Sequence, residues 1–198
     1  MNNHVKLEIP KDAFSDGQIR SKLWLAHNLE AWSQKYFDLA LNYTLTWYGS
    51  WVGLGPFLLL SLTRIKFTVV NLIEVDEESL NVSKKILDHW MVQGVQINLI
   101  KADMNNYLPE LITNNAELFI NTACEHVTHD KWLQNIPTGS FILLQSTNMK
   151  HIEHINLANS LEDFDAQIKP FFRVFEKNEI LFSYPDKCFS RFMLFGKK

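Results

Sequence analysis

A glycine-containing turn between two apolar runs constrains the fold of this chain more than any other feature. The run 42–48 has the composition of a buried strand, and the run 57–62 has that of a buried helix. Three glycines lie in the connecting segment, Trp47–Pro56. A strand, a glycine turn and a helix in this order can bind a nucleotide, because glycine lets the backbone approach a ligand and a helix start offers N–H donors. Three glycines also suit an ordinary tight turn.

An acidic residue follows the turn at the distance that a nucleotide-binding fold requires. The apolar run 69–73 leads into Glu74 and then Asp76. A dinucleotide-binding fold places a carboxylate on ribose hydroxyls about twenty residues after its glycines. Glu74 therefore favours ligand binding over a plain turn. Asp76 precedes Glu77–Ser79, and this position is typical of a cap at the start of a helix.

The rest of the chain alternates between strand and helix patterns. We expect further strands at 66–75, 96–100, 117–120 and 140–145, with helices at 77–90, 129–134 and 161–169. Two final strands, 179–184 and 190–195, flank a turn and predict a terminal hairpin. The pattern predicts an α/β protein with a Rossmann-like, doubly wound, mostly parallel seven-stranded sheet and an antiparallel terminal hairpin.

The N-terminal part of the chain predicts a helix outside this alternation. Phe14–Gln18 has the composition of a turn, and 21–32 has the apolar spacing of an amphipathic helix. We divide the chain into an N-terminal helical extension or lid, residues 1–40, and a Rossmann-like domain, residues 41–198.

Charge and composition narrow the classes of partner. The net charge of -3 argues against a protein that holds nucleic acid by phosphate contacts alone, and we see no strong nucleic-acid signature. Cys124 and Cys188 form no disulfide framework and suit a reducing compartment. The start of the chain lacks the apolar core of a signal peptide, and the apolar run 52–62 is too short to span a bilayer. We expect a soluble, cytoplasmic protein with no membrane partner, and we leave its oligomeric state open.

Several polar residues follow predicted strands and should meet in space. The glycine turn, Glu74, Asp103 and Asn121 each come directly after an apolar run. Ligands of open α/β sheets bind beyond the carboxyl ends of the strands. We therefore expect these segments to converge on one cleft.

In the order of these segments the chain resembles class I S-adenosylmethionine-dependent methyltransferases. Gly49–Gly55 stands where that family has its glycine-rich motif, and Ile73–Asp76 resembles the motif whose first acid holds the ribose. Asp103-Met104 resembles the segment beside the adenine, and Phe119–Val127 the segment after the fourth strand. Residues 132–142 resemble the apolar helix, turn and fifth strand that follow.

This resemblance implies a cofactor, a reaction and a set of binding residues. The cofactor is S-adenosylmethionine, and the reaction is in-line methyl transfer to an acceptor that we expect to be a small molecule. Glu74 would accept from both ribose hydroxyls, and Asp103 would accept from the adenine amino group with Met104 packed on the ring. The implied cofactor-binding residues are Tyr48, Gly49, Trp51, Gly53, Glu74, Val75, Asp103, Met104 and Asn121.

Three segments of the sequence also resemble a narrower group, small bacterial and phage proteins labelled as methyltransferases. These segments are 15–25, 121–126 and 190–194, and the resemblance brings no substrate with it. Residues 121–124 lack the proline-aromatic motif with which DNA amino-methyltransferases grip a flipped base, which argues against that substrate.

The glycine motif departs from the family pattern at two positions. Trp47 occupies the place of an acid that usually precedes the first glycine, and Trp51 replaces the middle glycine. An indole at position 51 could crowd the methionine end of the cofactor or stack against it. A descendant that binds the cofactor without turnover is therefore an open alternative.

Glu125 and His126 are the candidate catalytic residues, because a base is needed when the acceptor must lose a proton. His126 has a pKa range suited to that step, although a histidine here can also simply pack or bond to backbone. Asn121 can donate and accept, toward the cofactor, the acceptor or its own turn. Arg191 could face either the cleft or solvent.

The start of the predicted N-terminal helix offers a second set of candidate contacts. Gly17, Gln18, Arg20 and Lys22 could form a lid segment that contacts the cofactor's carboxylate. The alternative is a helix that only covers one face of the sheet.

Metal-ligating residue types recur between positions 124 and 154. Cys124, His126 and His129 have a Cys-x-His-x-x-His spacing, and His151 and His154 are three residues apart. Such spacings can bind zinc. Their order matches no metal site that we know, and histidines three apart often share a solvated face, so we assign no metal from the sequence.

Three other functions remain open at this stage. The same scaffold could transfer the aminocarboxypropyl group of S-adenosylmethionine, or bind that molecule without reaction. A nicotinamide-dependent oxidoreductase is disfavoured, because the glycines run G-x-x-x-G-x-G rather than G-x-G-x-x-G.

Overall fold

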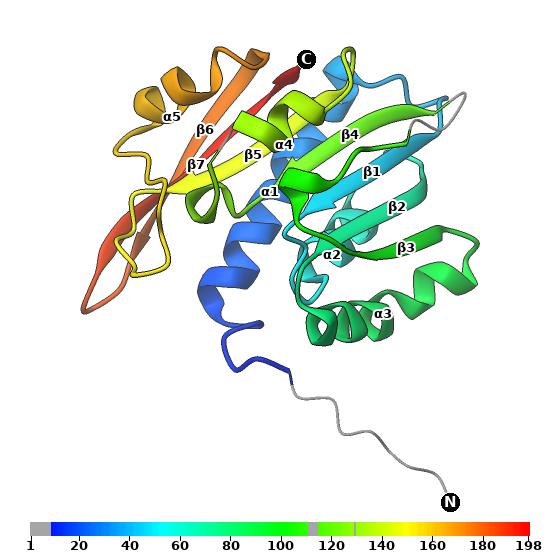
Figure 1. Cartoon of the computed structure of the whole chain (residues 1–198), viewed down its shortest axis with the longest axis horizontal. Helices are drawn as coiled ribbons and strands as arrows, with labels where there is room; N and C mark the ends of the chain where they lie inside the picture. The colour runs from blue at the N-terminus through cyan, green and yellow to red at the C-terminus, as the bar shows by residue number, and fades with distance from the viewer. Residues whose placement is uncertain (1–8, 111–114, 129) are drawn as a thin grey trace, which may run out of the picture.

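The computed structural model describes residues 9–110, 115–128 and 130–198, and one seven-stranded sheet forms its centre (Figure 1). The strand order is β3-β2-β1-β4-β5-β7-β6. The strands are β1 (Tyr43–Tyr48), β2 (Phe67–Glu74), β3 (Gln96–Lys101), β4 (Ala116–Asn121), β5 (Phe141–Thr147), β6 (Arg173–Ser183) and β7 (Cys188–Lys197). The pairs from β3 to β5 are parallel, and β7 runs antiparallel to both of its neighbours, β5 and β6. The predicted mostly parallel sheet with an antiparallel terminal hairpin is confirmed.

Helices cover both faces of the sheet, as the alternating pattern predicts. The helices are α1 (Asp16–Tyr36), α2 (Leu54–Leu62), α3 (Glu77–Val92), α4 (Asp130–Asn135) and α5 (Leu161–Ile168). The first three contribute to one apolar cluster, and α4 and α5 contribute to a second cluster on the opposite face. Figure 1 shows α1 behind the sheet and α4 in front of it. Because both faces are covered, every residue of β1 is buried.

Helix α1 is longer than its predicted range and shares the core of the sheet. It begins at Asp16, so the turn predicted for Phe14–Gln18 is wrong beyond Ser15. The Ser15 hydroxyl caps the helix by accepting from the Gln18 N–H, and a serine followed by aspartate and glycine suits a cap as well as a turn. Leu25 and Leu29 are buried in the same cluster as the sheet. The division at residue 40 stays a prediction.

Strand β6 begins at Arg173, before the predicted start at residue 179. Residues 173–178 include Glu176, Lys177 and Asn178, which hide the alternation that predicts a strand. Polar residues are tolerated there because β6 lies at the edge of the sheet. Its register with β7 shifts between Val174 and Glu176, which marks a bulge.

The parallel strands place their carboxyl ends at one edge of the sheet. Tyr48 at the end of β1 pairs with Ile73 in β2 and with Asn121 in β4. Two 3₁₀ helices follow strands at this edge, η1 (Met104–Asn106) after β3 and η2 (Cys124–His126) after β4. The segments predicted to converge are therefore adjacent.

Candidate functional site

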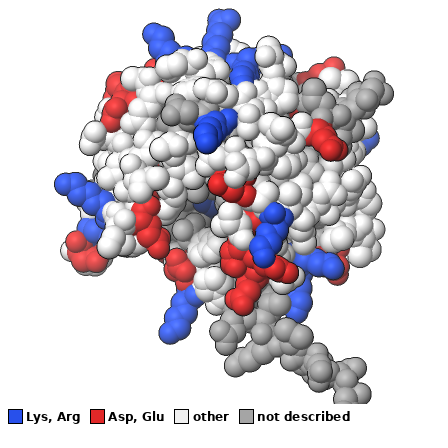
Figure 2. All heavy atoms as spheres, in the orientation of Figure 1, with Lys and Arg blue, Asp and Glu red and all other residues white. Residues whose placement is uncertain are grey.

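A cavity of about 690 Å³ opens at this edge of the sheet. Figure 2 shows a hollow on the same face, with basic atoms inside it and acidic side chains around its opening. Six of the predicted cofactor-binding residues line the cavity: Gly49, Trp51, Glu74, Val75, Asp103 and Met104. Both predicted catalytic residues, Glu125 and His126, line it as well. Residues that are far apart in sequence thus share one site.

The carboxylate of Glu74 is fixed by three backbone donors. Its Oε2 accepts from the Trp51 N–H at 2.8 Å, and its Oε1 accepts from Val75 at 2.8 Å and Asp76 at 3.2 Å. An ionised carboxylate has about four acceptor positions. Glu74 therefore joins the glycine turn to the end of β2 and keeps acceptor capacity for a ligand.

The glycine turn uses several of its own N–H groups internally. Gly49 and Ser50 donate to Ile73, and Gly53 donates to the Ser50 carbonyl. Gly53 caps α2 at a φ of 77°, where Ser83 lies close enough to leave little room for a side chain. Gly53 is not among the cavity residues. Ligand binding by the turn amides stays a prediction, and the amides of Gly49, Ser50 and Gly53 already have partners within the protein.

Trp51 stands in the left-handed region at a φ of 48°. Its N–H binds Glu74, and its carbonyl accepts from the Ser83 hydroxyl at 2.8 Å. The half-buried indole packs against a small apolar cluster that includes Ala13 and Val82. These contacts hold a conformation in which a tryptophan is strained, and they place the ring in the cavity wall.

The expected adenine side is open to solvent. Asp103 is exposed, and its Oδ1 caps η1 by accepting from the Asn105 N–H at 2.9 Å. Met104 is half-buried, and Val75 is 62% exposed at the rim. A carboxylate beside a thioether can bind an amino-bearing aromatic ring, so the arrangement is compatible with the predicted role.

Besides Gly53, two predicted cofactor-binding residues do not reach the cavity wall. Tyr48 is fully buried, and its ring stacks on Phe119 and meets Trp132 edge-on. Asn121 is also fully buried, and its Oδ1 accepts from the Ala123 N–H at 2.8 Å. Their contacts shape the strand ends behind the site, and direct contact of either side chain with a cofactor stays a prediction.

A buried ion pair, Glu125 with Arg191, forms another part of the cavity wall. The Arg191 Nη2 donates to the Glu125 Oε1 at 3.0 Å, and the two side chains are 11% and 2% exposed. Nη1 of Arg191 reaches the Thr122 carbonyl at 3.4 Å. Arg191 therefore faces the cleft, and β7 is tied to the segment after β4. Sequence reasoning left this orientation open.

Helix α1 contributes a lysine to the same wall. Lys22 and Gln18 line the cavity, as the lid hypothesis predicts, whereas Arg20 binds Asp16 and lies over the Phe182 ring. Burial and, to a smaller extent, the nearby Arg191 together lower the pKa of Lys22 to about 7, and Glu125 opposes this shift. No hydrogen bond to the Lys22 ammonium occurs within the described residues, so the group is available to an anionic ligand.

The Cys-x-His-x-x-His spacing noted in the sequence includes a cysteine that is poorly suited to bind zinc. Cys124 is fully buried, burial raises the pKa of its thiol, and the thiol lies 3.7 Å from the Asn121 carbonyl. Burial thus opposes the thiolate that zinc requires. His129 lies outside the described residues, and His151 is exposed and faces Glu153.

The fold is that of class I S-adenosylmethionine-dependent methyltransferases. The N-methyltransferase NodS from Bradyrhizobium japonicum WM9, solved with S-adenosyl-L-homocysteine, matches with a TM-score of 0.66 at 9% identity over 96% of this chain and 92% of its own. Magnesium protoporphyrin IX methyltransferase from Synechocystis, solved with bound SAM, matches at 0.63 and 10% identity over 96% and 87%. A candidate RNA methyltransferase from Pyrococcus horikoshii matches at 0.60 and 15% identity over 96% and 89%.

Sequence comparison adds no family beyond this structural likeness. Neither a protein-family model nor a curated protein sequence matches the chain. Among the described residues, no helix has the length and apolar character needed to cross a membrane. The cytoplasmic location stays a prediction.

Proposed function

We propose that the chain is an S-adenosylmethionine-dependent methyltransferase that acts on a small-molecule acceptor. The observation that carries the proposal is the Glu74 carboxylate, fixed by three N–H donors at the end of β2 and open to the cavity. Two neighbours of the same fold bind S-adenosylhomocysteine or S-adenosylmethionine. A carboxylate at this strand end is suited to bind the two hydroxyls of a ribose.

The groups around the cavity fit the chemical parts of that cofactor. Glu74 would accept from the ribose hydroxyls, and Asp103 with Met104 would hold the adenine. Lys22 would bind the carboxylate of the methionine part, because this residue lines the cavity and can carry a positive charge. The cofactor supplies a methyl group on a sulfonium centre, which is already a good leaving group.

The contribution of the protein is then positioning, water exclusion and proton removal. Glu125 lies against Arg191 in the wall and His126 lies at the surface of the same cavity. Either side chain could accept a proton from an acceptor, and both stay candidate catalytic residues. The bound pair of Glu125 and Arg191 would also keep that part of the wall rigid.

A small acceptor suits the size and charge of the site. The cavity of about 690 Å³ falls within the range of small-molecule sites. Five acidic residues line it and disfavour a phosphate backbone: Asp12, Glu74, Asp103, Glu125 and Glu153. The net charge of -3 points the same way.

Calorimetric titration with S-adenosylhomocysteine tests the proposal on three proteins: wild type, Glu74→Gln and Glu78→Gln. Glu74→Gln keeps an acceptor oxygen for the turn but loses the charge, whereas Glu78 is an exposed acid in the first turn of α3. We expect micromolar binding by wild type and Glu78→Gln, and about tenfold weaker binding or more by Glu74→Gln.

Absence of binding by the folded wild-type protein would overturn the cofactor assignment. Equal binding by all three proteins would remove Glu74 from the site. Binding without methyl transfer to any compound in an acceptor panel would instead favour a binding protein. Transfer of a larger group from S-adenosylmethionine, detected by the mass of the product, would favour aminocarboxypropyl chemistry.

A further inference from the structure

Three side chains that can bind a metal ion meet beside the cavity, and two of them, Glu125 and His126, line it. The carboxylate of Glu125 and the rings of His126 and His154 each offer one ligand atom, and these atoms lie within 4.8 Å of one another. Glu125 and His126 belong to η2, and His154 belongs to the loop between β5 and α5. The cluster differs from the spacing noted in the sequence, because a buried glutamate takes the place of Cys124.

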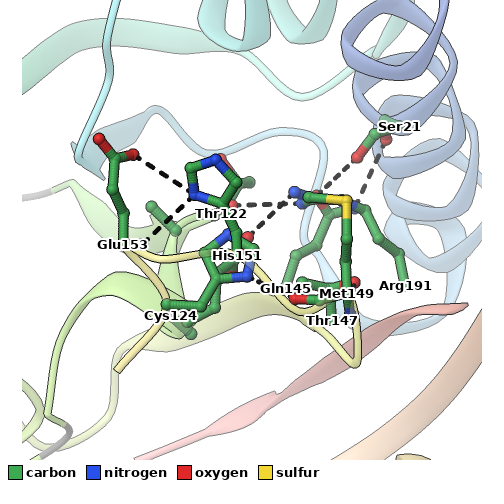
Figure 3. Close-up of polar contacts among 12 residues, drawn as sticks. Ser21, Thr122, Cys124, Gln145, Thr147, Met149, His151, Glu153 and Arg191 are labelled. Atoms are coloured by element: carbon green, nitrogen blue, oxygen red, sulfur yellow. Dashed lines mark hydrogen bonds and ion pairs between the residues drawn. The ribbon is translucent and has the colours of Figure 1, made fainter. Parts of the chain in front are cut away.

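Backbone hydrogen bonds hold the two segments together. The N–H groups of Ile155 and Asn156 both donate to the Glu125 carbonyl, at 2.9 and 3.0 Å. The side-chain amide of Asn156 (Nδ2) also donates to the Val127 carbonyl at 3.0 Å. Figure 3 shows this loop, with His151 and Glu153, beside the segment of Thr122 and Cys124. The position of His154 against η2 is therefore fixed by main-chain contacts.

The Glu125 carboxylate has an oxygen without a partner. Oε1 binds Arg191, whereas Oε2 is buried and makes no hydrogen bond to any described residue. The residue is 1% exposed. A buried carboxylate oxygen without a donor is costly, because it has lost its water. A cation at this oxygen would remove that cost, and this observation is independent of the histidine geometry.

The ring of His154 is oriented as in a metal ligand. Its Nδ1 lies 2.6 Å from the Met149 carbonyl, which can only accept, so Nδ1 carries the proton. The lone pair is then on Nε2. A backbone carbonyl that fixes the tautomer in this way is a common outer partner of metal-bound histidine. The His126 ring stands 4.8 Å away, centroid to centroid, and is nearly perpendicular.

We propose that Glu125, His126 and His154 bind one divalent transition-metal ion. Two imidazoles and one carboxylate suit zinc, iron(II) or manganese(II), and three protein ligands leave coordination positions open. Because Glu125 and His126 line the cavity, the open positions face the acceptor. The ion would bind an oxygen of the acceptor, which makes a hydroxyl compound the favoured substrate class. This role rests on the proposed function, whereas the binding of the ion does not.

Cobalt(II) titration of the chelator-treated full chain tests the site, because visible absorption of Co²⁺ reports its ligands. The proteins are wild type, His154→Gln, Glu125→Gln and the control His151→Gln, which changes an exposed histidine of the same loop outside the three-residue cluster. We expect one Co²⁺ per wild-type chain at micromolar metal and displacement by Zn²⁺. His154→Gln should weaken binding by at least about tenfold, and His151→Gln should leave it unchanged.

Several outcomes would overturn the site. These are no saturable spectrum with wild type, equal binding by His154→Gln, or equal loss in His151→Gln. Circular dichroism checks that each variant folds. If the His154→Gln protein does not fold, Glu125→Gln provides the second test of the site. S-adenosylhomocysteine binding by the chelator-treated protein is measured separately. If the protein binds S-adenosylhomocysteine but not Co²⁺, only the metal site is overturned. If it binds Co²⁺ but not S-adenosylhomocysteine, only the proposed function is overturned.

Discussion

The indole ring of Trp47 lies against Gly55, so closely that a Cβ at position 55 would overlap it. Trp47 is fully buried near the end of β1, and Gly55 is the second residue of α2. The glycine therefore lets the helix pack on the ring. Tryptophan at the place of the family's acid and glycine at the start of the helix form one packing unit.

Substitution of Gly55 by alanine should destabilise the protein although alanine favours helices. The added methyl must displace the Trp47 ring, and overpacking of this kind costs about 1–3 kcal/mol. Chemical denaturation measures the loss. Ser61→Ala, an exposed change in the same helix, should alter stability by less than about 0.5 kcal/mol. A Gly55→Ala protein as stable as wild type would show that the ring can move freely.

Because the backbone at Trp51 is left-handed, we expect glycine to be more stable than alanine at this position, the opposite of their order in a helix. Trp51→Ala and Trp51→Gly remove the same ring contacts, but only glycine adopts a φ of 48° without strain. Trp51→Gly should therefore be the more stable of the two by about 1 kcal/mol. At Lys85, an exposed position in α3, the alanine variant should instead be more stable than the glycine variant by a similar amount. Equal ranking at both positions would contradict the backbone assignment.

Loss of Arg191 should be costly because it leaves Glu125 buried without its ion partner. Arg191→Met is expected to destabilise the protein by about 3–5 kcal/mol in metal-free buffer. The double variant Arg191→Met/Glu125→Gln should recover part of this loss, since the buried charge is then gone. A double-mutant cycle by urea denaturation measures the coupling. Additive losses would show that the two side chains do not interact.

Lys22 should make stability depend on pH in a defined window. Its pKa is about 7 in the folded protein against an ordinary 10.5, so between these values the unfolded chain binds the proton more fully. The cost of burying the charge is complete below about pH 7 and is relieved as pH rises toward about 10. Arg191 and Glu125 are the charged groups that also act on it.

The Lys22→Met variant isolates this effect. It should be more stable than wild type at about pH 6, and the difference should shrink by about pH 10, as followed by urea denaturation. Lys84→Met, at an exposed position of α3, should show a stability difference that does not change with pH. A constant difference for Lys22→Met would mean that its ammonium stays solvated.

Much of the fold follows from local pattern. Apolar runs that alternate with helical spacing identify β1, β2, β4 and β5, because strands buried on both faces have few polar residues. The same logic fails at an edge strand, where Glu176 and Lys177 are tolerated and hide the start of β6. It also fails at the start of α1, where the sequence around Ser15 suits both a turn and a cap.

The candidate site is predictable only where its residues follow strands. Glu74 and Asp103 reach the cavity for that reason. The pair of Glu125 and Arg191 joins residues 66 positions apart, and the nearness of His154 to Glu125 depends on how one loop folds back. No local pattern encodes such contacts. Tyr48 and Asn121 also follow the pattern, yet their side chains turn into the core.

The anchoring of α1 has a consequence for how a molecule could reach the cavity. The buried Gln145 side chain donates to the Ser21 carbonyl and accepts from the Ser21 hydroxyl, one residue before Lys22. Movement of the helix beyond this point would expose Leu25 and Leu29 to water, which is unfavourable. In residues 9–20 the fully buried apolar side chain is the small Ala13, so displacement of this segment, which lines the cavity at Asp12, Ala13 and Gln18, would cost less.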